Sequence, residues 1–600
     1  MFIGKHKRAK TTPQPQNRSQ KHVLNERYNA HVKSYYYYEF VKSLSDENTD
    51  LFPRDAPIEN PRICIIGAGM AGLFSALLLN EAGIKGITIL EYQDRVGGRV
   101  HTHYFTDDPD DERRLYGELG AMRLPYTEGR PDLSVHQIVF DTIEYLNEYN
   151  KNDDPEKEIK TIPFIISNPN ALSYYNEQKD PSGKIMTKNF SGNVEASQLG
   201  FPDTIPPDFT SLLSEALLPF FNELNADFTK GLELLKHYDQ YSIYSFLKEV
   251  FLPARLPTRW EDYDEIIGAI EMQKSSGTGA FNLGFVDFVA ETHAFEGFEG
   301  TKHSINWKTI DKGMQRLPNA FLPIIRKEKI DLRYNSKVYK LEKAENGKQV
   351  KVYWKSKEKK EFEIFDRVIL TPPLGVIYHW DLPKLSYGKR RAIRELNYIP
   401  SVKIFLQFKS RFWENNGQPT TTGIGIVGGA TTTDLPIRRV IYPSYYVGLP
   451  INGSGVLCAS YNFENDALRY GPYSEEELFE LALKDIVILH GEIAREEWIP
   501  GKKNNKAQVW QNDKTVIGDF AAFTPAQLGK LMASIMRPEE GIYWAGEHTD
   551  IHHGWISGAL NSAVRVVKEI LSENLMKDRW MKLKKLRLLQ YWNGNLEAFE

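Results

Sequence analysis

The sequence predicts an α/β (α+β) fold built on a Rossmann-like parallel sheet, with further domains interleaved along the chain. Residues 62–99 give the first reason, because a short apolar strand, a glycine-rich turn, an apolar helix and a second strand follow one another there. Residues 542–571 show a strand, a glycine-containing loop and a helix in the same order. The length of 600 residues is the third reason, since one hydrophobic core rarely grows that large.

The first of these segments has the spacing of a dinucleotide-binding motif. Gly67, Gly69 and Gly72 directly follow the apolar run 63–66. The first glycine permits a tight turn, the second lets backbone amides approach a pyrophosphate at the helix N-terminus, and the third lets helix and strand pack closely. Glu91 ends the second strand, where a carboxylate accepts hydrogen bonds from a ribose. The sequence therefore predicts a bound dinucleotide.

Composition excludes several other classes of protein. With 41% hydrophobic and 26% charged residues, the chain is typical of a globular protein. Its formal net charge of −4 gives no overall attraction to nucleic acid or anionic membranes, so we expect neither as a partner. Residues 1–10 lack the apolar core of a secretory signal, and we expect a cytoplasmic protein. Cys64 and Cys458 lie in apolar runs typical of core positions, so we expect no disulfide framework and no metal site.

A second glycine-rich segment narrows the choice of cofactor. Arg95, Gly97, Gly98 and Arg99 form an RxGGR sequence within eight residues of Glu91. The glycines allow another close backbone approach, and guanidinium groups pair with phosphate oxygens. Taken alone, the segment reads as an ordinary basic turn. Behind the dinucleotide motif, it resembles the FAD-dependent amine oxidase superfamily, in which this segment lies along the flavin and the cofactor is FAD rather than NAD.

The resemblance covers roughly residues 58–572 and implies a GR2-type FAD-binding domain, an interleaved substrate-binding sheet domain and an inserted helical domain. The chain can be divided into domains on the basis of this resemblance. The expected boundaries are an N-terminal arm and extension (1–57), an FAD-binding domain (58–115, 308–378 and 505–572), a substrate-binding domain (116–130 and 379–504), a helical lid domain (131–307) and a C-terminal basic tail (573–600). The basic arm reads as a solvated extension, with contact to nucleic acid or a partner surface as the alternative. The tail reads as a surface helix rather than a membrane anchor.

Arg123 is the first candidate substrate-binding residue. It stands between apolar neighbours in LYGELGAMRLP (115–125), and a cation in such a setting needs a partner. Spacing alone supports an intramolecular ion pair and ligand binding equally. The segment resembles the substrate-binding stretch of L-amino acid oxidases, in which the arginine at this place clamps the substrate carboxylate. Oxidases of simple amines have no carboxylate to bind.

Two further candidates lie on apolar strands. Lys403 stands in SVKIFLQF, and a buried lysine is usually paired or functional. The resemblance implies that it holds a water against the flavin N5. Tyr461 stands in GVLCASYNF, where its residue type alone indicates an ordinary core tyrosine. The resemblance implies that its hydroxyl gives the second hydrogen bond to the substrate carboxylate.

The C-terminal strand, loop and helix complete the expected site. By resemblance, Gly554 offers its carbonyl to the substrate amine, Trp555 forms a wall of the pocket, and Trp510 lies beside the flavin. No cysteine occurs near Trp510, so the flavin is expected to be non-covalent. Together the motifs and the resemblance place these residues at the cofactor: Gly67, Ala68, Gly69, Met70, Ala71, Gly72, Glu91, Arg95, Gly98, Arg99, Met122, Arg123, Val338, Trp510, Gly546, Glu547, Gly554, Trp555 and Ile556.

The resemblance implies an FAD-dependent L-amino acid oxidase that converts L-α-amino acids and O2 to 2-oxo acids, ammonia and hydrogen peroxide, as a homodimer or higher homo-oligomer. An amino acid 2-monooxygenase and a mono- or polyamine oxidase are the alternatives within the same superfamily. A non-catalytic flavoprotein scaffold that tethers partners through the basic arm is a more distant one. No single histidine stands out as a substrate base.

Overall fold

The computed structural model describes residues 57–106, 115–127, 134–151, 158–191, 196–256, 262–274, 277–296, 305–357, 359–414, 425–445 and 453–589. The expected N-terminal arm, apart from residue 57, and the last residues of the expected basic tail lie outside these ranges. The described part of the tail contains the short helix α21 (Lys577–Leu583), as expected for a surface helix. Among the described residues, no helix combines the length and apolar character needed to cross a membrane.

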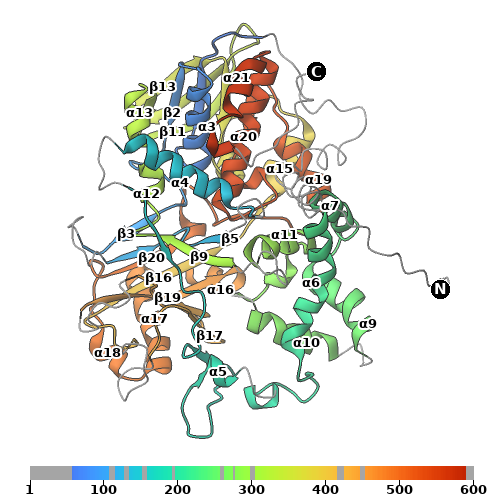
Figure 1. Cartoon of the computed structure of the whole chain (residues 1–600), viewed down its shortest axis with the longest axis vertical. Helices are drawn as coiled ribbons and strands as arrows, with labels where there is room; N and C mark the ends of the chain where they lie inside the picture. The colour runs from blue at the N-terminus through green and yellow to red at the C-terminus, as the bar shows by residue number, and fades with distance from the viewer. Residues whose placement is uncertain are drawn as a thin grey trace, which may run out of the picture.

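A five-stranded parallel sheet forms the upper part of the molecule in Figure 1. Its strands lie in the order β10 (Asp331–Arg333), β2 (Ile87–Leu90), β1 (Ile63–Ile66), β14 (Arg367–Leu370) and β22 (Ile542–Trp544). All neighbouring pairs run parallel, and four of the five strands are buried along their length. Parallel strands require covered faces, which explains why these segments read as continuous apolar runs. The predicted α/β fold class is confirmed.

Both faces of this sheet are covered. Ile63 and Ile65 pack with helices α3 (Met70–Glu81) and α20 (Ile556–Glu573), which lie against each other in Figure 1. Cys64 and Ile66 point to the opposite face, because side chains alternate along a strand. That face is covered by an antiparallel three-stranded sheet: β11 (Ser336–Lys343), β12 (Val350–Ser356) and β13 (Lys359–Phe365). Cys64 is therefore a core residue, as its sequence context indicates.

A seven-stranded sheet occupies the lower left of Figure 1. Its order is β20 (Asn505–Val509), β16 (Ser401–Phe408), β19 (Gly455–Phe463), β18 (Arg439–Ile441), β17 (Ala430–Thr433), β7 (Leu172–Tyr174) and β8 (Met186–Thr187). Helix α17 (Glu475–His490) packs on it and begins at a capping box formed by Ser474 and Glu477. The register places Lys403 directly opposite Tyr461.

A group of helices lies at the lower right of Figure 1. It comprises α6 (Phe209–Ala226), α7 (Phe228–Lys236), α8 (Ile243–Phe246), α9 (Leu252–Arg255), α10 (Asp262–Lys274) and α11 (Phe285–Glu296). The helical region is narrower than the expected interval 131–307. Residues 161–187 contribute strands instead, because β7 pairs with β17, far along the chain, and β8 pairs with β7 at the edge of the sheet. The exact domain limits stay a prediction.

Short elements connect these units. The small sheets pair β3 (Thr102–Tyr104) with β4 (Tyr116–Glu118), β9 (Ile305–Ile310) with both β5 (Leu124–Thr127) and β6 (Thr161–Pro163), and β15 (Asn397–Tyr398) with β21 (Ala521–Ala522). The remaining α-helices are α4 (Gln137–Asn150), α5 (Lys188–Ser191), α12 (Arg316–Asn319), α13 (Leu322–Lys327), α14 (Leu374–Ile377), α15 (Tyr387–Glu395), α16 (Glu464–Tyr470), α18 (Ile493–Glu497) and α19 (Leu528–Met536).

Candidate active site

A cavity of about 570 Å³ lies where the parallel sheet, the seven-stranded sheet and the helical group meet. Loops at the carboxyl ends of β1, β2, β14 and β22 line one end of it. This is the edge at which open α/β sheets bind their ligands. Residues of β18, β19, α6 and α11 line the rest. The cavity therefore connects a nucleotide-binding edge with a region walled by the other two units.

The glycine-rich turn after β1 has the geometry that its spacing predicts. Gly67 has a φ of +101°, which a side chain rarely tolerates. A Cβ added to Gly72 would lie 2.0 Å from the carbonyl oxygen of Gly67, so only glycine fits at this crossing of helix and turn. Helix α3 begins after Gly69 with no side-chain cap and no acidic residue in its first turn. Gly69, Met70 and Ala71 line the cavity, so the positive end of this helix is open to an anion.

Glu91 lies at the end of β2, as expected, and lines the cavity. Its carboxylate accepts hydrogen bonds from the backbone amides of Ala68 and Gln93, both at 2.7 Å. Burial raises the pKa of this carboxyl group, while the two backbone hydrogen bonds act in the opposite direction. Each carboxylate oxygen keeps a lone pair, so Glu91 both fixes the glycine turn and can accept from a ribose hydroxyl.

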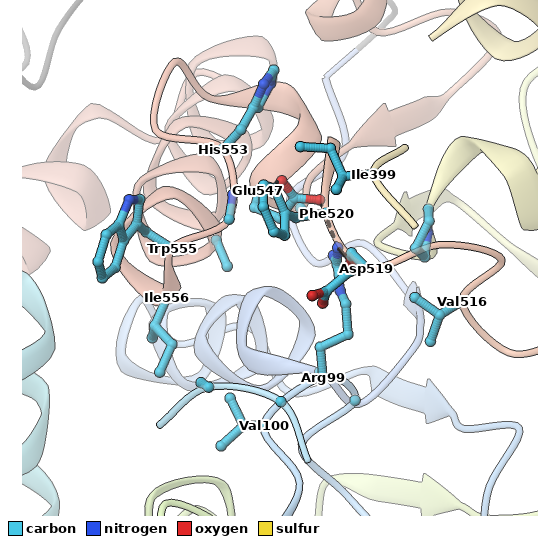
Figure 2. A pocket seen from close by; sticks show the side chains of 18 of the residues that line it. Arg99, Val100, Ile399, Val516, Asp519, Phe520, Glu547, His553, Trp555 and Ile556 are labelled. Atoms are coloured by element: carbon cyan, nitrogen blue, oxygen red, sulfur yellow. Dashed lines mark hydrogen bonds and ion pairs between the residues drawn. The ribbon is translucent and has the colours of Figure 1, made fainter. Parts of the chain in front are cut away.

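The two arginines of the second glycine-rich segment have different roles: one stabilises the loop, and the other lines the cavity. Arg95 donates to the carbonyl oxygens of Gly98 and Val96 and so holds the loop in shape. Arg99 lines the cavity and donates to the carboxylate of Glu547 at 2.8 Å and to the carbonyl of Asp519 at 2.6 Å. Figure 2 shows Arg99 reaching from this loop toward Glu547.

Glu547 is a buried carboxylate held ionised. Burial, the largest single influence, acts to raise its pKa, but the charges of Arg99, His553 and His548 and the Arg99 hydrogen bond together lower it to about 2. The backbone amide of Gly554 also donates to Glu547, at 3.2 Å. The ion pair therefore ties the loop after β2 to the loop before α20, across the width of the cavity.

The loop before α20 brings Gly546, Gly554, Trp555 and Ile556 to the cavity wall. Gly554 has a φ of +76°, and a Cβ there would lie 3.1 Å from the ring of Phe520. Helix α20, like α3, begins without a side-chain cap or an acidic first turn. Figure 2 shows Trp555 and Ile556 on the side of the cavity away from Val516.

These features fit a flavin dinucleotide. Two uncapped helix N-termini, the open glycine turn and Val338 of β11 line the same cavity, together with Glu91 at the position for a ribose. Phosphate groups suit the helix termini, because the backbone amides there have no partner of their own. The cavity therefore offers separate places for an anionic diphosphate and for a planar ring beyond it.

Arg123 lines the cavity, as do Phe295 and Tyr461. Its guanidinium faces the rings of Phe295, Trp307 and Phe164, at 4.9, 5.4 and 5.8 Å from their centres. Within the described part of the chain, no ion pair joins it to a carboxylate, and Glu291 acts on it only through its electrostatic field. Burial lowers the pKa of Arg123. It is a desolvated cation held by aromatic rings, and its place is open to an anionic ligand.

Tyr461 lines the cavity near Arg123, while Lys403 lies behind it. The ammonium of Lys403 is 4.6 Å from the centre of the Tyr461 ring and donates to the carbonyl oxygens of Glu118 and Gly120. Burial lowers the pKa of Lys403 to about 8. Lys403 thus fixes the strand segment that leads to Arg123.

Several residues expected at the cofactor lie just behind the cavity surface. Trp510 is fully buried and donates to the carbonyl oxygen of Leu119 at 3.0 Å, so it supports the floor below Gly120. Lys403 belongs to the same supporting layer. Three more of the residues expected at the cofactor, Ala68, Gly72 and Arg95, do not line the cavity and instead belong to its glycine-rich segments. The remaining expected residues all line the cavity.

The cavity also contains groups that the sequence reasoning did not single out. Asp519 and Arg439 both line it. His553 forms an ion pair of 2.9 Å with Asp287 of helix α11, which joins the helical group to the loop before α20. Burial, the largest single influence, would lower the pKa of His553, but the charge and hydrogen bond of Asp287, with the charges of Glu547 and Asp550, together raise it. Arg439 could have been suspected from the sequence, because it is a charged residue next to the apolar residues of a strand.

Comparison with known proteins agrees with this geometry. Residues 70–571 match the family described as flavin containing amine oxidoreductase. A putative L-amino-acid oxidase of Bacillus subtilis is 32% identical over 85% of this chain and 94% of its own length. An L-amino-acid oxidase of Siganus canaliculatus is 30% identical over 86% of each chain. A putative bifunctional amine oxidase of Dictyostelium discoideum is 32% identical, and this chain spans about half of its length, 47%.

Solved structures show the same fold. Cyclohexylamine oxidase from Brevibacterium oxydans superposes with a TM-score of 0.58, at 14% identity over 86% of this chain and 99% of its own. Putrescine oxidase bound to putrescine gives a TM-score of 0.54, at 15% identity over the same shares. The cavity at the carboxyl edge of the parallel sheet, its open helix termini and the match over most of the chain lead to one conclusion: the protein is an oxidoreductase that belongs to the flavin-containing amine oxidoreductase family.

Proposed function

We propose that the protein is an FAD-dependent L-amino acid oxidase. The observation that carries this proposal is Arg123, a half-buried guanidinium without a carboxylate partner in the described structure, which lines the cavity. A substrate carboxylate would compensate this charge through two parallel hydrogen bonds. A simple amine would leave the cation uncompensated and would bring a second positive charge beside it.

Tyr461 supports the same assignment. It lies close enough to Arg123 for the guanidinium to act on its pKa, and it lines the cavity. Burial raises the pKa of its hydroxyl, which therefore stays protonated and can donate to the substrate carboxylate. Arg123 and Tyr461 then fix one end of the substrate, and the Gly554 carbonyl accepts a hydrogen bond from its amine.

These contacts would present one face of the substrate Cα to the cofactor, which is catalysis by positioning. FAD, when bound, would supply the redox chemistry: a two-electron oxidation of the substrate at Cα, coupled to reduction of O2, with two protons, to H2O2. The protein excludes water with Trp555, Phe295 and Trp307, whose rings lie within 6.5 Å of one another, centre to centre. The imino acid product then hydrolyses to a 2-oxo acid and ammonia.

Lys403 has a supporting part in this proposal. Two of its three N–H groups go to the carbonyl oxygens of Glu118 and Gly120, which leaves one for a water molecule. Because burial lowers its pKa to about 8, the amine exchanges protons readily near neutral pH. We propose that this N–H holds a water close to the redox-active part of the flavin.

We also propose that FAD is bound without a covalent link and that the enzyme is a homodimer. The chain has two cysteines, both buried in apolar cores away from the cavity lining. Denaturing the purified protein should therefore release all of the flavin into the supernatant. Flavin that stays with the precipitated chain would contradict the non-covalent assignment.

Product analysis tests the proposed reaction. The purified holoenzyme should release peroxide, ammonia and the matching 2-oxo acid in equal amounts from an L-amino acid. An amide together with CO2 would assign the protein to the amino acid 2-monooxygenases. Turnover of benzylamine or spermine in place of amino acids would contradict the role of Arg123. Failure of every substrate with flavin bound would favour a non-catalytic flavoprotein.

A further inference from the structure

A second arginine in the cavity has no carboxylate partner. Arg439 opens β18 and lines the cavity, and within the described residues it forms no ion pair. Its neighbour Arg438, which lies just before the strand, forms an ion pair of 3.4 Å with Asp466. Arg438 also donates to the carbonyl oxygens of Thr433 and Met272. Arg438 therefore has the ion pair and hydrogen bonds that are typical of a structural arginine. Arg439 has no such ion pair in the described structure.

Arg439 lies close to the proposed carboxylate clamp. Burial, followed by the positive charge of Arg123, lowers its pKa to about 10. Tyr461 and Tyr175 act on it in the opposite direction. The two arginines are therefore near enough to repel each other, and both face the space beside Tyr461.

A third cation strengthens the positive field. Burial and the charge of Arg439 lower the pKa of Lys188 to about 8, and no carboxylate pairs with this lysine in the described chain. Lys188 belongs to α5, outside the cavity lining, so it acts from behind Arg439. Arg123 and Arg439 thus line the cavity as two cations, and Lys188 adds positive charge from outside the lining.

The acidic residues of the cavity wall do not neutralise this cluster. Asp287 pairs with His553, and burial together with repulsion from Glu271 raises the pKa of Glu464 to about 7, which weakens its negative charge near neutral pH. Glu291 acts on Arg123, but it forms no ion pair with either arginine. One substrate carboxylate compensates one guanidinium, which leaves the second half-buried cation without a counter-charge.

We propose that Arg439 binds the side-chain carboxylate of an acidic L-amino acid while Arg123 and Tyr461 hold its α-carboxylate. This inference rests on the proposed oxidase function and specifies its substrate class. A dicarboxylate supplies the two negative charges that the two guanidiniums require. An amide of the same shape leaves Arg439 unpaired, so the site distinguishes acid from amide by charge.

The test compares matched substrates in the holoenzyme. kcat/KM is measured for L-glutamate against L-glutamine and for L-aspartate against L-asparagine, in the wild type, Arg439→Gln and Arg439→Lys. The wild type should prefer an acid over its amide. Arg439→Gln should lose about 100-fold on that acid, as expected when one partner of a buried charge pair is truncated, with little change on the amide. Arg439→Lys should retain part of the preference.

A charge-matched control lies on the same cavity. Lys514 lines it beside Thr515, and its ammonium lies 5.8 Å from the centre of the Tyr92 ring, beyond Glu91. Lys514→Gln also removes one positive charge and should leave the ratio of acid to amide turnover unchanged. Equal losses on acid and amide in Arg439→Gln, or a wild-type preference for amides or apolar amino acids, would overturn the proposal.

A binding measurement separates this inference from the oxidase assignment. Glutarate, succinate and butyrate are titrated into the holoenzyme while the visible spectrum of the flavin is followed. A dicarboxylate should bind more tightly than butyrate, and Arg439→Gln should remove that advantage. If this result appears without turnover of any amino acid, the dicarboxylate site stands and the oxidase function fails. If butyrate binds as tightly as both dicarboxylates in the wild type, the dicarboxylate site fails.

Discussion

Replacing Arg123 with methionine tests the carboxylate clamp in depth. Methionine keeps much of the side-chain volume among Phe164, Phe295 and Trp307 and removes only the charge and the donors. Truncating one partner of a buried charge pair costs about 2–5 kcal/mol. At about 1.4 kcal/mol per tenfold, kcat/KM on an L-amino acid should fall by roughly 30-fold to 4,000-fold.

The same substitution should leave the free protein as stable as before. No ion pair of Arg123 is broken in the described structure, and a desolvated cation is removed. The free energy of unfolding of the apoprotein should therefore stay unchanged or rise, and the flavin should remain bound. A structural ion pair predicts the opposite, because its partner would be left buried and uncompensated.

The assay is steady-state peroxide release at several substrate concentrations, with denaturant unfolding of the same preparations. Arg123→Lys serves as the control, since it keeps the charge but loses the bidentate geometry and should lie between the wild type and Arg123→Met. Near-normal kcat/KM in Arg123→Met would refute the clamp. A large loss of stability together with normal kcat/KM would show that Arg123 is structural.

Three further predictions follow from the geometry. Gly72→Ala should prevent flavin binding or folding, because the new Cβ would lie 2.0 Å from the carbonyl oxygen of Gly67; a yellow, stable variant would contradict this. Arg99→Gln should lower the free energy of unfolding by about 3–5 kcal/mol and release flavin, since Glu547 would stay buried without its partner; unchanged melting would contradict this. Burial raises the pKa of Glu118 to about 7 from 4.5, so its contribution to stability is full below pH 4.5 and is lost as pH rises through 7. Glu118→Gln should therefore flatten the unfolding free energy between these pH values, a difference of up to about 3 kcal/mol, and an unchanged pH profile would contradict this.

The dinucleotide-binding motif could be predicted from the sequence because the contacts that determine its residues are local. The turn of Gly67, the close contact at Gly72 and the carboxylate of Glu91 all lie within one strand–helix–strand unit. Backbone sterics and hydrogen bonding within that unit determine which residue types fit, so their spacing carries the information. The pairing of Arg99 with Glu547 joins segments far apart in the chain, and only the resemblance placed both at the cofactor.

Other features of the fold and the site could not be predicted, because they depend on contacts between residues far apart in the sequence. Residues 172–174 form a strand because β17 provides a parallel partner more than 250 residues later, although the surrounding region reads as helical. Lys403 and Trp510 lie one layer behind the cavity, because both contact the backbone segment at Gly120, and Gly120 itself lines the cavity. Arg438 and Arg439 look alike in the sequence, and only the position of Asp466 distinguishes the paired arginine from the unpaired one.

Anaerobic reduction of the bound flavin in a single turnover tests most directly whether Arg123 selects L-amino acids as substrates. An L-amino acid, its D-isomer and the amine that lacks its carboxylate are each mixed with the holoenzyme, and the loss of visible flavin absorbance is followed. The L-isomer should bleach the flavin rapidly and the other two negligibly, because only the L-isomer presents Cα–H to the flavin from the Arg123 clamp. Equal or faster bleaching by the amine would contradict this expectation.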